Sequence, residues 1–279
     1  MYHMYIKNII FPKINEHRRD YPANIIYELG RNDFPLIKPV TLIYGSNGSG
    51  KSTLLNIIAH KLQCKREIHA ETKPIFDHED GKLVFLLDEI ARKTIIRKES
   101  SYGWPQNRRM ITSAEVLDHI SLKNDHNNWV YNDIKNEIDR MDRWEWEDND
   151  GEISEGSLYL KKISERDQYY RMSMKGKSVF SNGEEMLDYF FELMEPNSIY
   201  LLDEPENCLS TVYQKKLADY ILDLANNHNC QFLIASHSPF FLSIQDAHII
   251  DIDQSPATDC NNWAELENMQ PYFELFTNR

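Results

Sequence analysis

The sequence predicts an α/β fold with a mostly parallel sheet, in a single domain that spans residues 1–279. The apolar run 40–43 leads through a glycine-rich turn into the helix-like segment 54–59. A second run at 198–202 is followed by a turn, a helical stretch and a third run at 231–235. Short apolar runs alternating with helices are typical of buried parallel strands joined by crossover helices. A chain of this length can bury a large core around such a sheet.

The turn after the first run has the spacing of a phosphate-binding loop, which is Gly, four residues, then Gly-Lys-Ser. Its glycines let successive backbone N–H groups approach phosphate oxygens. Lys51 adds a full positive charge, and the Ser52 hydroxyl is a magnesium ligand in such loops. The residues expected to hold nucleotide are Gly45, Ser46, Asn47, Gly48, Ser49, Gly50, Lys51, Ser52 and Thr53.

A phosphate loop needs a carboxylate to organise Mg²⁺ and water, normally at the end of a neighbouring buried strand. Two segments, 83–89 and 198–204, both read as apolar strands that end in Asp-Glu. The second is favoured, because a turn, a helix and a strand ending at His237 follow it. Open α/β sheets bind ligands at the carboxyl ends of their strands. We therefore expect Asp203, Glu204 and His237 to lie beside the phosphate loop.

The order of four motifs carries a family resemblance. The phosphate loop is followed by SNGEE at 181–185, LLDEP at 201–205 and SHSP at 236–239. This order resembles the ATPase head shared by ABC transporters, repair and chromosome-organising ATPases, and OLD-type ATPases. Within that group the chain is most similar to small stand-alone predicted ATPases of bacteria. The likeness covers nearly the whole chain and is weakest between about residues 60 and 175.

This resemblance implies ATP and Mg²⁺ as ligands, and a P-loop NTPase fold of the ABC-ATPase type. It implies that Lys51 and the loop amides hold the β- and γ-phosphates, while Ser52 and Asp203 hold Mg²⁺. Glu204 would orient and deprotonate the attacking water, and His237 would contact the γ-phosphate or that water.

Ser181 and Gly183 resemble the signature motif of these ATPases, which caps the γ-phosphate bound by a second subunit. Phe180 and Asn182 depart from the Leu-Ser-Gly-Gly-Gln consensus of transporters. The apolar face of the following helix, 184–194, is typical of core. Because the chain has one phosphate loop and one signature, two copies arranged head to tail would complete each site. We therefore expect an ATP-sandwiched homodimer.

The remaining segments predict how the domain is elaborated. Residues 5–10 and 24–29 read as strands of an N-terminal antiparallel edge, with Tyr21 or Tyr27 either stacking on adenine or packing in the core. Residues 88–175 read as an inserted helical arm, in which a capping box at 112–115 opens a helix. Gln106 is a candidate lever-loop glutamine by analogy with related ATPases. Residues 248–253 read as a last strand and 263–276 as a closing helix.

Composition narrows the classes of function. The net charge of −13 opposes nonspecific adhesion to nucleic acid or anionic membrane. A basic run at 92–109 leaves contact with nucleic acid open, beside the alternative of a solvated helical face. No run approaches the roughly 18 apolar residues of a membrane span, and residues 1–7 do not resemble a signal peptide. We expect no membrane insertion, a cytoplasmic location and reduced thiols at the four widely spaced cysteines.

Three functions fit these observations. The first is an ATP hydrolase whose ATP-driven dimerisation regulates a partner, such as a defence or toxin effector or a nucleic-acid process. The second is the nucleotide-binding subunit of a membrane transporter, which the diverged signature and the acidic arm disfavour. The third is a non-hydrolysing ATP switch or scaffold, against which the pair Glu204 and His237 argues.

Overall fold

The computed structural model describes residues 3–18, 20–66, 82–99, 103–105, 107–121 and 182–277. The chain divides into two compact units, one made of Met1–Asp118 with Met186–Arg279 and the other of His119–Glu185. Most described residues belong to the first unit, and the sheets, core and phosphate loop described below lie within it.

A six-stranded, mostly parallel sheet is the centre of this unit, as the sequence predicts. Its order is β5-β6-β7-β3-β8-β9. The parallel members are β3 (Val40–Tyr44), β5 (Asn107–Thr112), β6 (Ser198–Asp203), β7 (Gln231–Ala235) and β8 (His248–Asp251), and β9 (Thr258–Cys260) is antiparallel. Every residue of β3, β6, β7 and β8 is buried, which explains why these strands read as continuous apolar runs.

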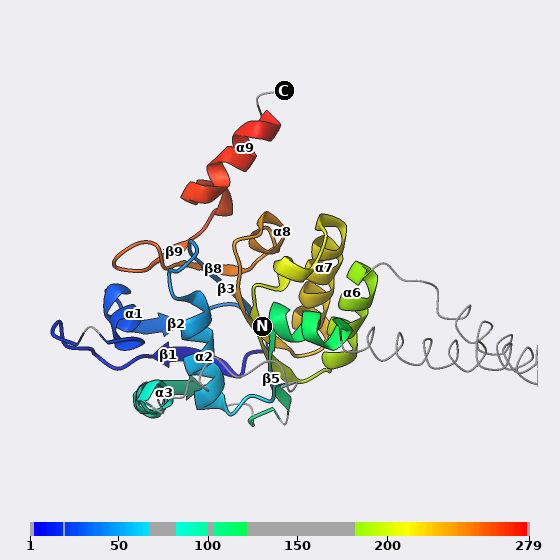
Figure 1. The fold of residues 1–279 in the computed structure, drawn as a ribbon. Coiled ribbons are helices and arrows are strands. Elements are labelled where there is room, and N and C mark those ends of the chain that lie inside the picture. Colours follow the sequence, from blue (N-terminus) through cyan, green and yellow to red (C-terminus); the bar gives the residue numbers. More distant parts are fainter. Residues whose placement is uncertain are drawn as a thin grey trace, which may run out of the picture. The chain divides into compact units, whose positions relative to one another are not determined.

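Helices cover both faces of this sheet (Figure 1). The helix α2 (Lys51–Leu62) begins at the phosphate loop and buries most of its length, from Lys51 to Leu62. The helix α7 (Thr211–Asn227) presents Leu217, Ile221 and Leu224 as its buried face. The helix α6 (Asn182–Leu193) buries Met186, Leu187 and Phe190, with Met194 just beyond its end, in agreement with the predicted apolar face.

A separate three-stranded antiparallel sheet packs over the α2 side of the parallel sheet. Its order is β2-β1-β4, formed by β2 (Asp33–Pro35), β1 (Ile6–Ile10) and β4 (Ile95–Lys98). The N-terminal segment therefore forms antiparallel pairs, as predicted, but in a sheet separate from the parallel one. The buried amide of Gln231 joins the layers: its Oε1 accepts from the N–H groups of Tyr5 and Ile6, at 2.9 and 2.8 Å.

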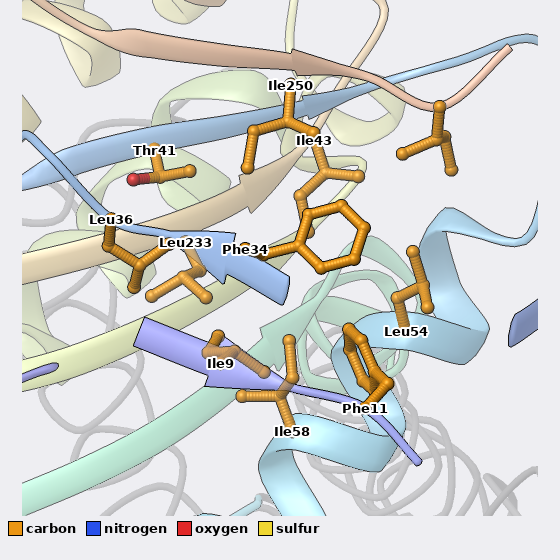
Figure 2. A pocket seen from close by; sticks show the side chains of 11 residues that line it. Ile9, Phe11, Phe34, Leu36, Thr41, Ile43, Leu54, Ile58, Leu233 and Ile250 are labelled. Atoms are coloured by element: carbon orange, nitrogen blue, oxygen red, sulfur yellow. The ribbon is translucent and has the colours of Figure 1, made fainter. Parts of the chain in front are cut away.

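The core between the two sheets encloses a cavity of about 20 Å³. Figure 2 shows its lining, in which Ile9 and Phe34 of the small sheet face Ile43, Leu233 and α2. The hydroxyl Oγ1 of Thr41 lies in this lining and has no hydrogen-bond partner among the described residues. A buried water needs two to four polar partners, so a space lined by one hydroxyl and apolar groups is expected to stay dry.

Two segments that read as strands are helices. Residues 24–29 lie mainly in α1 (Ala23–Glu28), which buries Ile25, Ile26 and Leu29. Residues 83–89 lie in α3 (Lys82–Lys93), which buries Leu87, Ile90 and Ala91. In both cases the buried side chains recur after three or four residues, a helical period that outweighs the β-propensity of isoleucine, leucine and valine.

The predicted arm, 88–175, does not start where the sequence suggests. Its first third contains the end of α3, the strands β4 and β5, and a helix from residue 113 to 121. The second compact unit starts only at His119. The predicted capping box is present: Thr112 N–H donates to Glu115 Oε2 at 3.0 Å, and Glu115 N–H donates to Thr112 Oγ1 at 3.2 Å. Residues 122–181 lie outside the described part of the chain.

The C-terminal segment is interrupted rather than one closing helix. Short 3₁₀ turns, Trp263–Glu265 and Glu267–Met269, precede α9 (Gln270–Thr277). Leu266 has extended backbone angles, φ −66° and ψ 134°, and its side chain is buried. Anchoring Leu266 in the body breaks the helical path at that residue. The strand predicted at 248–253 is present as β8, but it is not the last strand, because β9 follows it.

Candidate functional site

The phosphate loop connects β3 to α2. Two of its glycines, Gly48 and Gly50, have different structural roles. Gly48 has φ +83°, and a Cβ atom there would meet nothing within 4 Å. Gly50 has φ +98°, and a Cβ atom there would lie 2.3 Å from Ile25 Cγ2. Gly50 is therefore required for close packing against α1, whereas Gly48 leaves the outer side of the loop open. Ser46, Asn47 and Gly48 are exposed, so a ligand has access to this side.

Lys51 starts α2 and is folded back into its own loop. Its side chain is only 3% exposed. The ammonium Nζ donates to the carbonyls of Gly45 at 2.9 Å and Ser46 at 3.0 Å, and lies 3.5 Å from Glu204 Oε1. The loop thus holds a buried cation beside a carboxylate, which is the charge arrangement that a triphosphate and its attacking water require.

Ser52 and Asp203 meet at the carboxyl end of β6. The Ser52 hydroxyl donates to Asp203 Oδ1 at 3.0 Å. Burial raises the pKa of the Asp203 carboxyl to about 6, although the bond from Ser52 acts in the opposite direction. A buried carboxylate and a hydroxyl are hard oxygen donors of the kind Mg²⁺ prefers. The residues present therefore fit a magnesium ion.

Glu204 occupies a left-handed conformation immediately after β6, with φ +47° and ψ +51°. Its N–H donates to Ala235 O at 2.9 Å, which continues the pairing of β6 with β7. On the other side, Asn207 Nδ2 donates to Glu204 Oε2 at 2.8 Å. A non-glycine residue in this region is uncommon and persists only when its surroundings hold it. The carboxylate lies between Lys51 and Asn207 and is 27% exposed.

His237 follows β7 and is held by Glu206, a residue of the 3₁₀ turn Pro205–Cys208. Glu206 Oε1 accepts from the backbone N–H of His237 at 2.9 Å and from Ser236 Oγ at 2.8 Å. Neither Glu206 nor Asn207 is among the site residues predicted from the sequence. Both lie within four residues of Asp203, directly after the end of β6. This position is the feature of the sequence that could have indicated a role in the site.

A concavity of about 640 Å³ lies next to the loop, lined by Tyr27, Glu28, the loop residues 46–49 and Asp253. The Asp253 carboxylate accepts from the Ser46 N–H, at 2.7 and 2.9 Å, and from the Ser46 hydroxyl at 2.9 Å. Of the two tyrosines considered for adenine, Tyr27 lines this concavity. The Tyr21 hydroxyl instead bonds Thr53 Oγ1 at 2.8 Å.

The signature residues are only partly described. Gly183 is the second residue of α6 and belongs to the second compact unit. Ser181 lies outside the described residues, as does Gln106, the candidate lever-loop glutamine.

Much of the basic run is paired within the protein. Arg92 and Lys93 form ion pairs with Asp88 and Glu89, one turn earlier on α3. Lys98 and Arg108 lie over the ring of Trp104, at 5.3 and 5.8 Å from its centre. These contacts disfavour a nucleic-acid-binding stripe. The predicted alternative, one solvated helical face, is also wrong, because only Arg92 and Lys93 lie on a helix and the rest of the run lies on β4 and β5.

The fold and the site together define a P-loop ATPase of the ABC type. The sequence model of the family described as ABC transporter matches residues 38–207, and that described as AAA ATPase domain matches residues 184–242. The first match covers more than half of the chain, so the chain belongs to the ABC transporter family. Among the described residues, no helix combines the length and apolar character needed to cross a membrane. Comparison with curated proteins finds no match.

Among solved structures, the chain is similar to the SMC head domain of Pyrococcus furiosus with an extended coiled coil, bound to the C-terminal domain of ScpA. The identity is 14%, over 98% of this chain and 100% of that one, with a TM-score of 0.43. Stu0660 of Streptococcus thermophilus is 13% identical over 98% and 80%, with a TM-score of 0.42. The SMC head domain of Thermotoga maritima is 12% identical over 92% and 98%, with a TM-score of 0.41.

Proposed function

We propose that the protein hydrolyses the γ-phosphate of ATP in a magnesium-dependent reaction. The main observation behind this proposal is that two pairs of residues lie at the same edge of the parallel sheet. Ser52 contacts Asp203, and Lys51 lies 3.5 Å from Glu204. A metal-binding pair beside a cation and a candidate base is the set of groups that phosphoryl transfer uses.

The chain's own groups have separable roles. The loop amides and Lys51 bind the phosphates, and the lysine exchanges its carbonyl partners for phosphate oxygens. Ser52 and Asp203 would hold Mg²⁺, which, when bound, stabilises the negative charge of the transferred phosphoryl group. Glu204 orients the attacking water and accepts its proton. His237 contributes a contact to the γ-phosphate or to that water.

The concavity beside the loop is the proposed location of the ribose and base. It is continuous with residues 46–49, and the ring of Tyr27 supplies an aromatic surface in its lining. Tyr27 is 47% exposed, which suits a ring that stacks on a ligand better than one that fills the core. Tyr21 is engaged with Thr53 and is the weaker candidate.

We propose further that two copies bind two ATP molecules head to tail. Glu204 and His237 are 27% and 43% exposed, and Ser46 to Gly48 are open to solvent. Phosphoryl transfer benefits from a site closed to water, so a second protein surface over these residues would complete it. The resemblance assigns that surface to the Ser181–Gly183 signature of the partner copy. ATP-driven dimerisation would then regulate a protein partner, for which a defence or toxin effector is the expected class.

The variant Glu204→Gln tests both parts of this proposal. It keeps the shape of the side chain and the bond from Asn207 but removes the proton acceptor. We expect ATP binding to persist, the hydrolysis rate to fall by about 100-fold or more, and ATP-bound dimers to accumulate in light scattering. The matched control is Glu267→Gln, an exposed residue outside the site. Unchanged turnover would remove Glu204 from its role, and a strictly monomeric ATP-bound variant would contradict the dimer.

A further inference from the structure

Glu206 is a buried carboxylate that the proposed reaction does not use directly. It is 7% exposed, and its Oε1 accepts from Ser236 Oγ and from the His237 N–H. Among the described residues, its one ionisable side-chain partner within 4 Å is the imidazole of His237, whose Nδ1 lies 3.4 Å from Oε1. Burying a carboxylate is costly unless its oxygens are hydrogen-bonded or paired with a cation. The position of Glu206 therefore calls for a reason beyond packing.

Two polar atoms of this pair lack partners in the described part of the chain. Glu206 Oε2 and His237 Nδ1 are both buried and form no hydrogen bond there. A small rotation of the imidazole would let a protonated Nδ1 donate to the carboxylate, whose Oε1 is 3.4 Å away. Carboxylates that accept from one imidazole nitrogen fix which nitrogen carries the proton and how the ring is oriented.

We propose that Glu206 is the positioning residue of His237. Its carboxylate holds the proton on Nδ1, so that Nε2 of the neutral imidazole is free to accept a hydrogen bond from the attacking water. A contact in which Nε2 donates to the γ-phosphate needs a second proton on the ring. This role rests on the proposed function of His237, but the position of the proton does not depend on turnover. Glu206 itself acts through His237 and touches no reacting atom.

A second side chain, that of the half-buried Gln214, connects the same two loops. Gln214 Nε2 donates to the carbonyls of Glu206 at 3.3 Å and Leu209 at 2.9 Å, while its Oε1 accepts from Ser238 Oγ at 2.7 Å. Glu206 and Gln214 thus link the turn that begins at Glu204 to the loop that carries His237. These hydrogen bonds fix the position of Glu204, the candidate base, relative to His237.

The test is Glu206→Gln, which keeps the size of the side chain and an acceptor for Ser236. Nitrogen-15 NMR of the imidazole at pH 8, assigned by comparison with His237→Ala, is expected to show the proton on Nδ1 in the wild type and redistribution toward Nε2 in the variant. The catalytic rate constant is expected to fall about 10- to 100-fold, with ATP affinity and the melting temperature close to wild type. Glu267→Gln serves as the control.

A double-mutant cycle separates positioning from folding. In the His237→Ala background, Glu206→Gln should cause no further loss of rate, because the group it positions is gone. A further loss of the same size as in the wild type would assign Glu206 a structural role and overturn the proposal. So would a wild-type imidazole protonated on Nε2, a result independent of any variant folding. If the wild type does not hydrolyse ATP, the proposed function fails, whereas the NMR result still decides the position of the proton.

Discussion

Replacing Asp203 by asparagine should make the nucleotide-free protein more stable. Burial raises the pKa of this carboxyl from its ordinary 3.8 to about 6, so the folded state disfavours the charged form. At about 1.4 kcal/mol for each tenfold change in the ionisation constant, the rise corresponds to about 3 kcal/mol. The amide oxygen of asparagine can still accept the Ser52 hydroxyl. We expect Asp203→Asn to gain at most about 3 kcal/mol at pH 8, less the cost of its new amide donor.

The sign of this effect depends on pH in a defined way. Below pH 3.8 the carboxyl is protonated in both the folded and the unfolded chain, and its ionisation costs the folded state nothing. Between 3.8 and about 6 the unfolded chain loses the proton first, so the wild type loses stability relative to the variant. Above about 6 both states are ionised and the difference stays constant. The advantage of Asp203→Asn should therefore grow between pH 4 and 6 and then level off.

Urea unfolding in EDTA, at several pH values between 4 and 8, measures this difference as the gap between the two free energies of unfolding. Adding Mg²⁺ with ATP should reverse the order, because the wild type gains binding energy that the variant lacks. A variant that is less stable than the wild type at pH 8 in EDTA would refute the reasoning. An advantage that does not change with pH would show that it does not come from ionisation.

Two further substitutions test the loop and the predicted helix start. Lys51→Ala removes the buried ammonium and should weaken ATP binding by about 10- to 100-fold in calorimetry. The control Lys61→Ala, at the opposite end of the same helix, should not, and equal affinities of the two variants would contradict the assignment of the loop. Glu115→Ala loses both the cap on Thr112 and the 2.9 Å ion pair with Arg66, and should cost about 2–4 kcal/mol in urea unfolding. Glu115→Gln retains the cap and should cost less, so identical losses would show that the cap contributes nothing.

The parallel sheet and the residues of the site were predictable because each depends on local pattern. Fully buried strands read as continuous apolar runs, and the carboxyl ends of parallel strands meet at one edge. The phosphate loop, Asp203 and Glu204 could be placed on that basis. Glu206 was not assigned a role, because its partners Ser236 and His237 lie 30 and 31 residues away and only the folded turn brings them within hydrogen-bond distance.

Two segments predicted as strands are helices for the same physical reason. Residues 24–29 and 83–89 are rich in isoleucine, leucine and valine, and short apolar segments fit a strand or a buried helix equally well. In both segments the packing of the buried side chains against the rest of the protein stabilises the helix.

The strand β5 was not predicted, because its first residues, Asn107 to Arg109, are polar or charged and only half-buried, while Met110 to Thr112 are buried. A strand at the end of a sheet needs no continuous apolar run.

The link between Gln231 and the first strand has a consequence for synthesis. Tyr5 and Ile6 find their hydrogen-bond acceptor 226 and 225 positions further along the chain. During translation, the N-terminal strand therefore waits for most of the polypeptide to leave the ribosome before this amide can satisfy it. Contacts so distant in sequence slow folding, so these two backbone N–H groups find their acceptor later than β1 can pair with β2 and β4. The backbone at Tyr5 and Ile6 is thus among the last parts of this domain to complete its hydrogen bonds.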